Sequence, residues 1–243
     1  MCIMIVENMT RTKLRLLDLY CKAGGTSMGY YRAGFEVVGI DIEPQPDYPF
    51  EFHQADALTY PLEGFDAYHA SPPCKADNQA VLCRPERETL RATYPRLIAP
   101  TRQRLLATGK PFVIENVPLA RHQLINPIML CGTMFGLKVR RHRYFELHGF
   151  EILFAPASCG CKGKAGFTNA SSGFSSFANG AKLISVAGHN FSVSDAQIAM
   201  GIDWTGQDGL SQAIPWRYTE FIAGYLHDAV MKQWESQGSP HEG

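Results

Sequence analysis

The sequence lacks an excess of charge of either sign, because its 243 residues include 23 lysines and arginines and 23 aspartates and glutamates. A surface coated with positive charge is therefore excluded, and a polyanionic partner would have to be met by a local basic patch. The chain also lacks an apolar run of about 18 residues, so no membrane-spanning helix is expected. Its first residues are apolar before they are basic, which is the wrong order for a secretory signal. These absences leave a globular chain, long enough to bury a full core as one large domain.

Cysteine is present but not in a pattern typical of a metal site. Of the seven cysteines, Cys159 and Cys161 are separated by one residue, which is tighter than the two-residue spacing usual in zinc knuckles. Reduced, buried or idle thiols are the simplest interpretation of most of the seven. No metal site is predicted. Whether Cys159 and Cys161 bind a metal, together with His148 or His189, is left open by the sequence.

Short β-rich runs alternate with helical stretches through the first half of the chain. This alternation predicts a mostly parallel sheet with helices on both faces. The expected strands cover residues 14–17, 35–40, 51–54, 65–69 and 111–114. The expected helices cover a stretch that Gly34 closes, residues 87–108 with breaks near Pro95 and Pro100, residues 193–201 and residues 215–233. Ligands of open parallel sheets bind at the carboxyl ends of the strands, so the polar residues there are the candidates for function.

Acidic residues stand at or just beyond the ends of the first three expected strands. Asp18 precedes a glycine-rich turn that reaches Gly25 and would let a cofactor approach the backbone. The turn lacks the G-x-G-x-x-G spacing of dinucleotide-binding loops. Asp41 is placed to accept a ribose hydroxyl, and Asp56 could hold an adenine amine. Each acid alone could be a capping or turn residue, but the three together favour an adenosine site.

Three further polar motifs follow along the chain. Two prolines make the approach to Cys74 rigid, and a thiol at a sheet edge is a candidate nucleophile. Glu115 follows the fifth expected strand, where a carboxylate could protonate or orient a heterocycle. Arg141 and Arg143 would lie on one face of an extended segment and could hold an anionic oxygen or a phosphate. Each motif is weak by itself, and their order along the chain is the informative feature.

Together, and in this order, these motifs resemble those of the DNA cytosine carbon-5 methyltransferase family, in a short form similar to phage-encoded members. The matching segments are Asp18–Gly25, Asp41, Asp56, 72–74, 115–117 and Arg141-x-Arg143, and Ser211–Ile214 resembles the last family motif. The resemblance spans roughly residues 14–228. It implies a Rossmann-like, S-adenosylmethionine-dependent methyltransferase fold of the α/β class, with a small loop-rich lobe.

This resemblance suggests a division of the chain. The division comprises an N-terminal extension (1–13), a catalytic and cofactor-binding core (14–150), a small target-recognition lobe (151–192), a C-terminal part returning to the core (193–236) and a disordered tail (237–243). The lobe is small for a recognition element of this family. A short or relaxed DNA sequence context is therefore expected.

The resemblance implies a covalent mechanism. Cys74 would attack carbon 6 of cytosine and so make carbon 5 nucleophilic. Glu115 would contact N3 and the exocyclic amine, Arg141 would hold the O2 oxygen, and Arg143 would support the site or a phosphate. The target base would be flipped out of the duplex. The cofactor would be S-adenosylmethionine, bound by Asp18, Tyr20, Lys22, Gly24, Gly25, Asp41, Ile42, Asp56, Ala57, Pro72, Gln212 and Ala213.

The partner implied is double-stranded DNA, with no membrane contact. The protein is expected to be a monomer in the cytoplasm of a bacterium or a phage-infected host cell. Basic residues after the nucleophile and in the lobe could meet phosphates, although an ordinary helix with outward arginines explains the first group equally well. The DNA-binding candidates are Lys75, Arg84, Arg87, Arg91, Lys162 and Lys164.

Three residues depart from the family pattern, since Lys22 replaces the usual Gly, Lys75 the usual Gln and Gln212 the usual Asn. One interpretation is drift, with Lys75 on a phosphate. A second is a non-catalytic, DNA-binding relic. A third is a changed donor, carboxy-S-adenosylmethionine, whose carboxylate would attract a lysine that a bare sulfonium would repel. An RNA cytosine methyltransferase with the same motifs is a further alternative.

Overall fold

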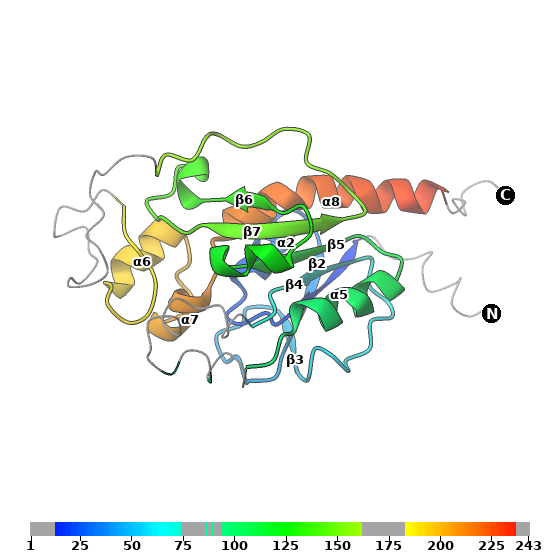
Figure 1. Cartoon of the computed structure of the whole chain (residues 1–243), viewed down its shortest axis with the longest axis horizontal. Helices are drawn as coiled ribbons and strands as arrows, with labels where there is room; N and C mark the ends of the chain where they lie inside the picture. Colours follow the sequence, from blue (N-terminus) through cyan, green and yellow to red (C-terminus); the bar gives the residue numbers. More distant parts are fainter. Residues whose placement is uncertain (1–12, 74–85, 87–88, 90–93, 162–182, 237–243) are drawn as a thin grey trace.

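The computed structural model describes residues 13–73, 86, 89, 94–161 and 183–236. Its centre is a seven-stranded sheet in the order β3-β2-β1-β4-β5-β7-β6 (Figure 1). β1 to β5 are parallel to one another, whereas β7 is antiparallel to both β5 and β6. The strands are β1 (Arg15–Leu19), β2 (Glu36–Asp41), β3 (Glu51–Gln54), β4 (Ala67–Ala70), β5 (Phe112–Asn116), β6 (Ile128–Leu130) and β7 (Arg143–His148). The predicted fold class, a Rossmann-like α/β fold with a mostly parallel sheet, is confirmed.

The side chains of β1 show why helices cover both faces of the sheet. Leu16 belongs to a buried cluster that includes Tyr30 and Leu226, whereas its neighbour Leu17 belongs to another cluster that includes Leu105. Successive side chains of a strand point to opposite faces, so one apolar strand contributes to two cores. The helices that supply these partners are α2 (Gly25–Arg32), α5 (Ile98–Ala107) and α8 (Trp216–Ser236).

The contact between α2 and α8 joins the beginning of the fold to its end. The hydroxyl of Thr219 donates to the backbone oxygen of Thr26 at 2.7 Å, across 193 positions of sequence. Gly29 allows this approach, because a Cβ there would collide with Thr219 and with the backbone of α8. The long C-terminal helix is therefore part of the same core as β1 and β2.

Some predicted boundaries are wrong. Asp18 and Glu115 lie inside β1 and β5 rather than beyond them, because strand pairing continues through both residues. Residues 94–97 are non-helical, in line with a break near Pro95. The break expected near Pro100 is absent, since Pro100 lies in the first turn of α5, where its missing N–H would have no partner within the helix.

Two helices beyond the sheet pack together at one end of the molecule, drawn yellow and orange in Figure 1. They are α6 (Val193–Met200), which matches the expected short helix, and α7 (Gln207–Gln212), which is not predicted from the sequence. Two short 3-10 helices, η3 (Pro118–Gln123) and η4 (Gly132–Phe135), are also absent from the sequence-based prediction. Within the described part of the chain, no helix combines the length and the apolar composition needed to cross a bilayer.

Candidate active site

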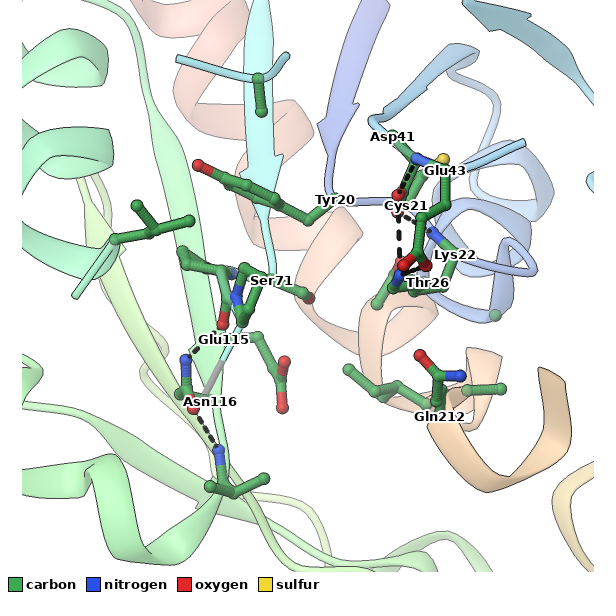
Figure 2. A pocket seen from close by; sticks show the side chains of 18 of the residues that line it. Tyr20, Cys21, Lys22, Thr26, Asp41, Glu43, Ser71, Glu115, Asn116 and Gln212 are labelled. Atoms are coloured by element: carbon green, nitrogen blue, oxygen red, sulfur yellow. Dashed lines mark hydrogen bonds and ion pairs between the residues drawn. The ribbon is translucent and has the colours of Figure 1, made fainter. Parts of the chain in front are cut away.

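The carboxyl ends of β1, β2, β4 and β5 open into one pocket of about 700 Å³. Figure 2 shows Ser71, Glu115 and Asn116 on one side of this pocket and Lys22, Asp41 and Glu43 on the other. The end of α7 supplies a further wall. A pocket of this size accommodates a small-molecule cofactor.

The side of the pocket beside β2 is suited to an adenosine group. Asp41 is buried, and its two carboxylate oxygens accept hydrogen bonds from the backbone N–H groups of Lys22 and Glu43 at 3.2 and 3.0 Å. Ile42 leaves 67% of its surface exposed, an apolar face beside a fixed acid. Asp56 also lines the pocket, and its side chain accepts from Leu58 N at 2.8 Å. A ribose and a planar ring would find an acceptor and an apolar surface here.

The loop after β1 contains several residues in the left-handed region of backbone conformation. Tyr20 and Lys22 have positive φ angles of 62° and 47°, and Gly24 has 77°. Gly25 cannot be enlarged, because a Cβ there would collide with the backbone oxygen of Ile214. Tyr20, Lys22 and Gly25 line the pocket, whereas Gly24 is not among the lining residues.

Asp18, which the sequence predicts at the cofactor, is not among the lining residues either. Its carboxylate is buried beneath the loop and accepts hydrogen bonds from the hydroxyls of Thr26 and Ser27 at 2.7 and 2.5 Å. Burial raises the pKa of Asp18 to about 7, against the effect of these two hydrogen bonds. Asp18 therefore stabilises the first turn of α2 through these two side-chain hydrogen bonds.

Lys22 makes two ion pairs at the adenosine side of the pocket. Its ammonium nitrogen lies 2.7 Å from a carboxylate oxygen of Glu43 and 3.6 Å from one of Asp41. Sequence reasoning weighed Lys22 against the sulfonium alone and missed Glu43, which stands only two positions beyond Asp41. The charge of Lys22 is balanced by these two acids.

The opposite side of the pocket holds a buried acid. Glu115 is 5% exposed, and its Oε1 atom lies 3.1 Å from Nε of Arg143. Burial raises the pKa of Glu115, whereas Arg143, a hydrogen bond with Ser71 and Arg141 act in the opposite direction. Burial therefore makes Glu115 a weaker acid than an exposed glutamate.

Asn116 connects this acid to the predicted nucleophile segment. Its side-chain amide donates to the backbone oxygen of Pro72 at 2.9 Å, and its Oδ1 atom accepts from Val117 N at 2.9 Å. Both Pro72 and Pro73 line the pocket. Asn116 belongs to the 115–117 motif, but no role for it follows from the sequence. Its buried amide fixes the chain directly before Cys74.

Arg141 and Arg143 both line the pocket, as the spacing of an extended segment predicts. The guanidinium of Arg141 is buried and donates to the backbone oxygens of Val186 and Ser211, the latter at 2.8 Å. Its own backbone oxygen accepts from the hydroxyl of Tyr218 at 2.7 Å. Arg141 is therefore held by three segments that are distant in sequence.

The remaining predicted residues divide into two groups. Ala57, Gln212 and Ala213 line the pocket with the residues described above. The others lie outside the described residues, and these are Cys74, Lys75, Arg84, Arg87, Arg91, Lys162 and Lys164.

Comparison with known proteins identifies the fold. No protein-family model matches the chain, and no curated protein matches its sequence. A protein assigned as a DNA modification methyltransferase encoded within an E. coli prophage is similar over 90% of this chain and 100% of its own, with a TM-score of 0.56 and 14% identity. The Entamoeba histolytica methyltransferase EhMeth is similar over 90% of this chain and 99% of its own, with a TM-score of 0.62 and 14% identity. The chain therefore shares its fold with these two methyltransferases.

Proposed function

We propose that this protein is a DNA cytosine carbon-5 methyltransferase that uses S-adenosylmethionine. The observation that carries the proposal is the arrangement of a single pocket. A buried acid paired with Arg143 lies on one side, and Asp41 with the exposed Ile42 lies on the other. The segment that ends at Pro73, immediately before Cys74 in the sequence, also lines this pocket.

The cofactor fits the residues at the adenosine side. Asp41, whose oxygens are already oriented by two backbone N–H groups, would accept from a ribose hydroxyl, and Ile42 would cover the purine. Gly25 brings backbone close to the pocket where a side chain could not fit. When bound, S-adenosylmethionine supplies an electrophilic methyl group on a sulfonium centre.

Glu115 is suited to activate cytosine as an acid. Burial raises its pKa, so the carboxyl group keeps its proton to higher pH than an exposed glutamate and could donate it to N3 of the base. Arg143, 3.1 Å away, then stabilises the carboxylate that remains. Arg141 presents a buried guanidinium for the O2 oxygen, positioned by the carbonyl groups that it contacts.

Cys74 would supply the nucleophile. As a thiolate it forms a bond to carbon 6, while N3 takes the proton from Glu115 and electron density moves to carbon 5. After carbon 5 is methylated, a base removes its proton and the bond between carbon 6 and sulfur breaks. Cys74 leaves as a thiolate, and the proton on N3 returns to Glu115. Because the pocket lies at the edge of the sheet, a base within a duplex must be flipped out to reach it.

The test is mass spectrometry of nucleosides from DNA and from transfer RNA of cells that produce the protein. The wild type should yield 5-methylcytosine in DNA, and Cys74→Ser should yield none while it still folds. Modification confined to transfer RNA would contradict the DNA assignment and favour the RNA alternative. 5-Carboxymethylcytosine would show that the donor carries a carboxylate.

A second experiment separates the enzyme from a non-catalytic DNA-binding protein. DNA that contains 5-fluorocytosine should form a covalent adduct with the wild type in the presence of the cofactor, because fluorine at carbon 5 blocks release of Cys74. DNA binding without an adduct, over a library of sequence contexts, would contradict the covalent mechanism.

A further inference from the structure

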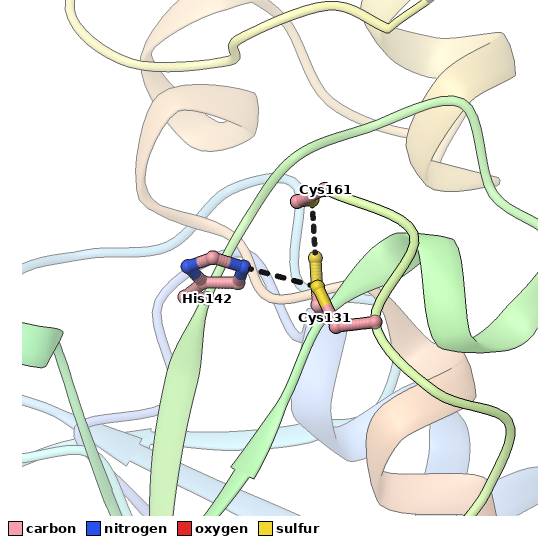
Figure 3. Close-up of side chains that lie close together, drawn as sticks. Cys131, His142 and Cys161 are labelled. Atoms are coloured by element: carbon pink, nitrogen blue, oxygen red, sulfur yellow. Dashed lines mark hydrogen bonds between the residues drawn. The ribbon is translucent and has the colours of Figure 1, made fainter. Parts of the chain in front are cut away.

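Three thiols and one imidazole converge in a part of the molecule that the proposed reaction does not use. Cys131 directly follows β6, His142 directly precedes β7, and Cys159 and Cys161 lie in the segment after β7. One potential ligand atom from each of the four lies within 4.8 Å of all the others. Figure 3 shows Cys131, His142 and Cys161 gathered at this point.

The distances among these atoms are close to those of a tetrahedral metal site. The sulfur atoms of Cys131 and Cys161 are 3.3 Å apart, and Nε2 of His142 lies 3.4 Å from the sulfur of Cys159. With zinc–sulfur bonds of about 2.3 Å, the edge of a tetrahedron is about 3.8 Å. Small side-chain rotations would therefore bring all four atoms to bonding distance around one ion.

The chemistry of the four ligands selects the kind of cation. Three thiolates this close together would repel one another unless a cation lay between them. Thiolate and imidazole ligands in a tetrahedral arrangement suit zinc, whereas calcium and magnesium require oxygen ligands. With four protein ligands, the site would be closed, as structural zinc sites are.

The hydroxyl group of Thr133 contacts all three thiols of the cluster. Its hydroxyl oxygen lies 3.5, 3.6 and 3.7 Å from the sulfur atoms of Cys131, Cys159 and Cys161. The same oxygen accepts a hydrogen bond from Gly160 N at 3.0 Å, which fixes the turn between the last two cysteines. Contacts of this kind orient ligands at metal sites. A disulfide between two of the thiols would leave the third and the imidazole unexplained.

We propose that Cys131, His142, Cys159 and Cys161 bind one zinc ion. The ion would tie β6, the beginning of β7 and the segment around Gly160 together. His142 stands between Arg141 and Arg143, which both line the pocket. In an extended segment its side chain faces away from theirs, so zinc on that face would position the two arginines without touching the substrate.

The first experiment measures zinc in the full-length protein, purified under reducing conditions without chelators. Elemental analysis and native mass spectrometry should find one zinc per chain. Cys131→Ser and Cys161→Ser should lower the zinc content at least tenfold, whereas Cys21→Ser, which removes a buried cysteine outside the cluster, should retain it.

Because cysteine variants of a structural site can fail to fold, a second pair of variants keeps the test decisive. His142→Cys preserves a four-ligand site and should retain one metal, whereas His142→Ala should bind it at least tenfold more weakly. His189→Ala is the control, since His189 is an exposed residue that pairs with Asp208. Cobalt in place of zinc should give thiolate charge-transfer bands that differ between the wild type and His142→Cys.

The readouts are independent of methyl transfer. A folded wild type that contains no zinc and takes up no cobalt would overturn the proposal. So would iron with inorganic sulfide in place of zinc, or an intact mass two hydrogens lower that maps to a bond between Cys131 and Cys161.

Discussion

The two sides of the pocket treat a buried carboxyl group differently. On the side beside β2, Asp41 is surrounded by two backbone N–H donors and the ammonium of Lys22, which suits an acceptor of hydroxyl groups. On the opposite side, burial raises the pKa of Glu115 despite its contact with Arg143, which suits a group that carries a proton. Under the proposed function, the same sheet edge would supply one carboxyl group that holds the cofactor and another that takes part in the reaction.

The substitution Glu115→Gln tests this difference between the two sides most directly. The amide cannot donate the proton, so the rate of transfer should fall by about two to four powers of ten. Affinity for the cofactor, measured by calorimetry, should change little, because the residue lies on the other side of the pocket. A large loss of cofactor affinity would contradict the assignment of the two sides.

A third buried acid, Asp18, should make stability depend on pH. Its pKa is about 7 in the folded protein, against the ordinary aspartate value of 3.8, so the folded state keeps a proton that the unfolded chain releases. Stability should therefore fall as the pH rises from about 4 to about 7, by up to about 4 kcal/mol. Urea unfolding across this range measures the fall, and Asp18→Asn should flatten it. An unchanged pH profile in Asp18→Asn would refute the assignment.

Arg141→Ala should lower the transfer rate by about two to three powers of ten, as the loss of a positioned donor does. Single-turnover kinetics measure this effect. Arg217→Ala is the matched control, because Arg217 is an exposed arginine of α8 that pairs with Glu220. If the two variants were equally active, Arg141 would have no role at the base.

Asp41→Ala should have the opposite signature to Glu115→Gln. Loss of a charged acceptor costs roughly 1.5–3 kcal/mol, so cofactor affinity should fall about ten- to hundredfold. Transfer at saturating cofactor should stay close to that of the wild type. A strong loss of rate at saturation would show that the two sides are not separable.

Of these variants, Lys22→Met should have the smallest effect, both on stability and on the product formed. Lys22 lies closest to the exposed Glu43, and a partly exposed salt bridge of this kind contributes at most about 1 kcal/mol. The buried Asp41 is farther from the ammonium nitrogen, at 3.6 Å. Competition between S-adenosylmethionine and carboxy-S-adenosylmethionine should give 5-methylcytosine with both wild type and variant. A carboxymethyl product that disappears in Lys22→Met would assign the lysine to the donor after all.

The helices and strands that the sequence predicts are those with a local pattern of apolar residues or a recognisable end. The run that ends in Asp41 is mostly apolar and β-branched, and Gly34, with a positive φ of 100°, directly follows Ala33, the C-cap of α2. The predicted ends of both elements are therefore within a residue or two of the observed ones. α7 is short and has no such pattern, so only packing against α6 reveals it.

Site residues that stand in a recognisable sequence motif are predicted. Contacts between residues that are distant in the sequence are missed. Glu115 and Arg143 are each visible in their motifs, but the pairing of Lys22 with Glu43 depends on the bend after β1. The thiol cluster is the clearest case. The sequence predicts no metal site and leaves open only a site of Cys159 and Cys161 with His148 or His189, whereas the sheet brings His142 and Cys131 to the two cysteines. In the structure, His148 stacks on Phe112 instead.

The contact of α8 with α2 has a consequence for synthesis on the ribosome. Thr26 leaves the exit tunnel long before Thr219, its partner 193 positions later, and Gly25 packs against Ile214. In a nascent chain, the loop after β1 and the start of α2 therefore lack these neighbours until residues 213–219 have been translated. A chain released early should leave apolar strands uncovered and bind no donor, so donor affinity would distinguish completed protein from truncated products.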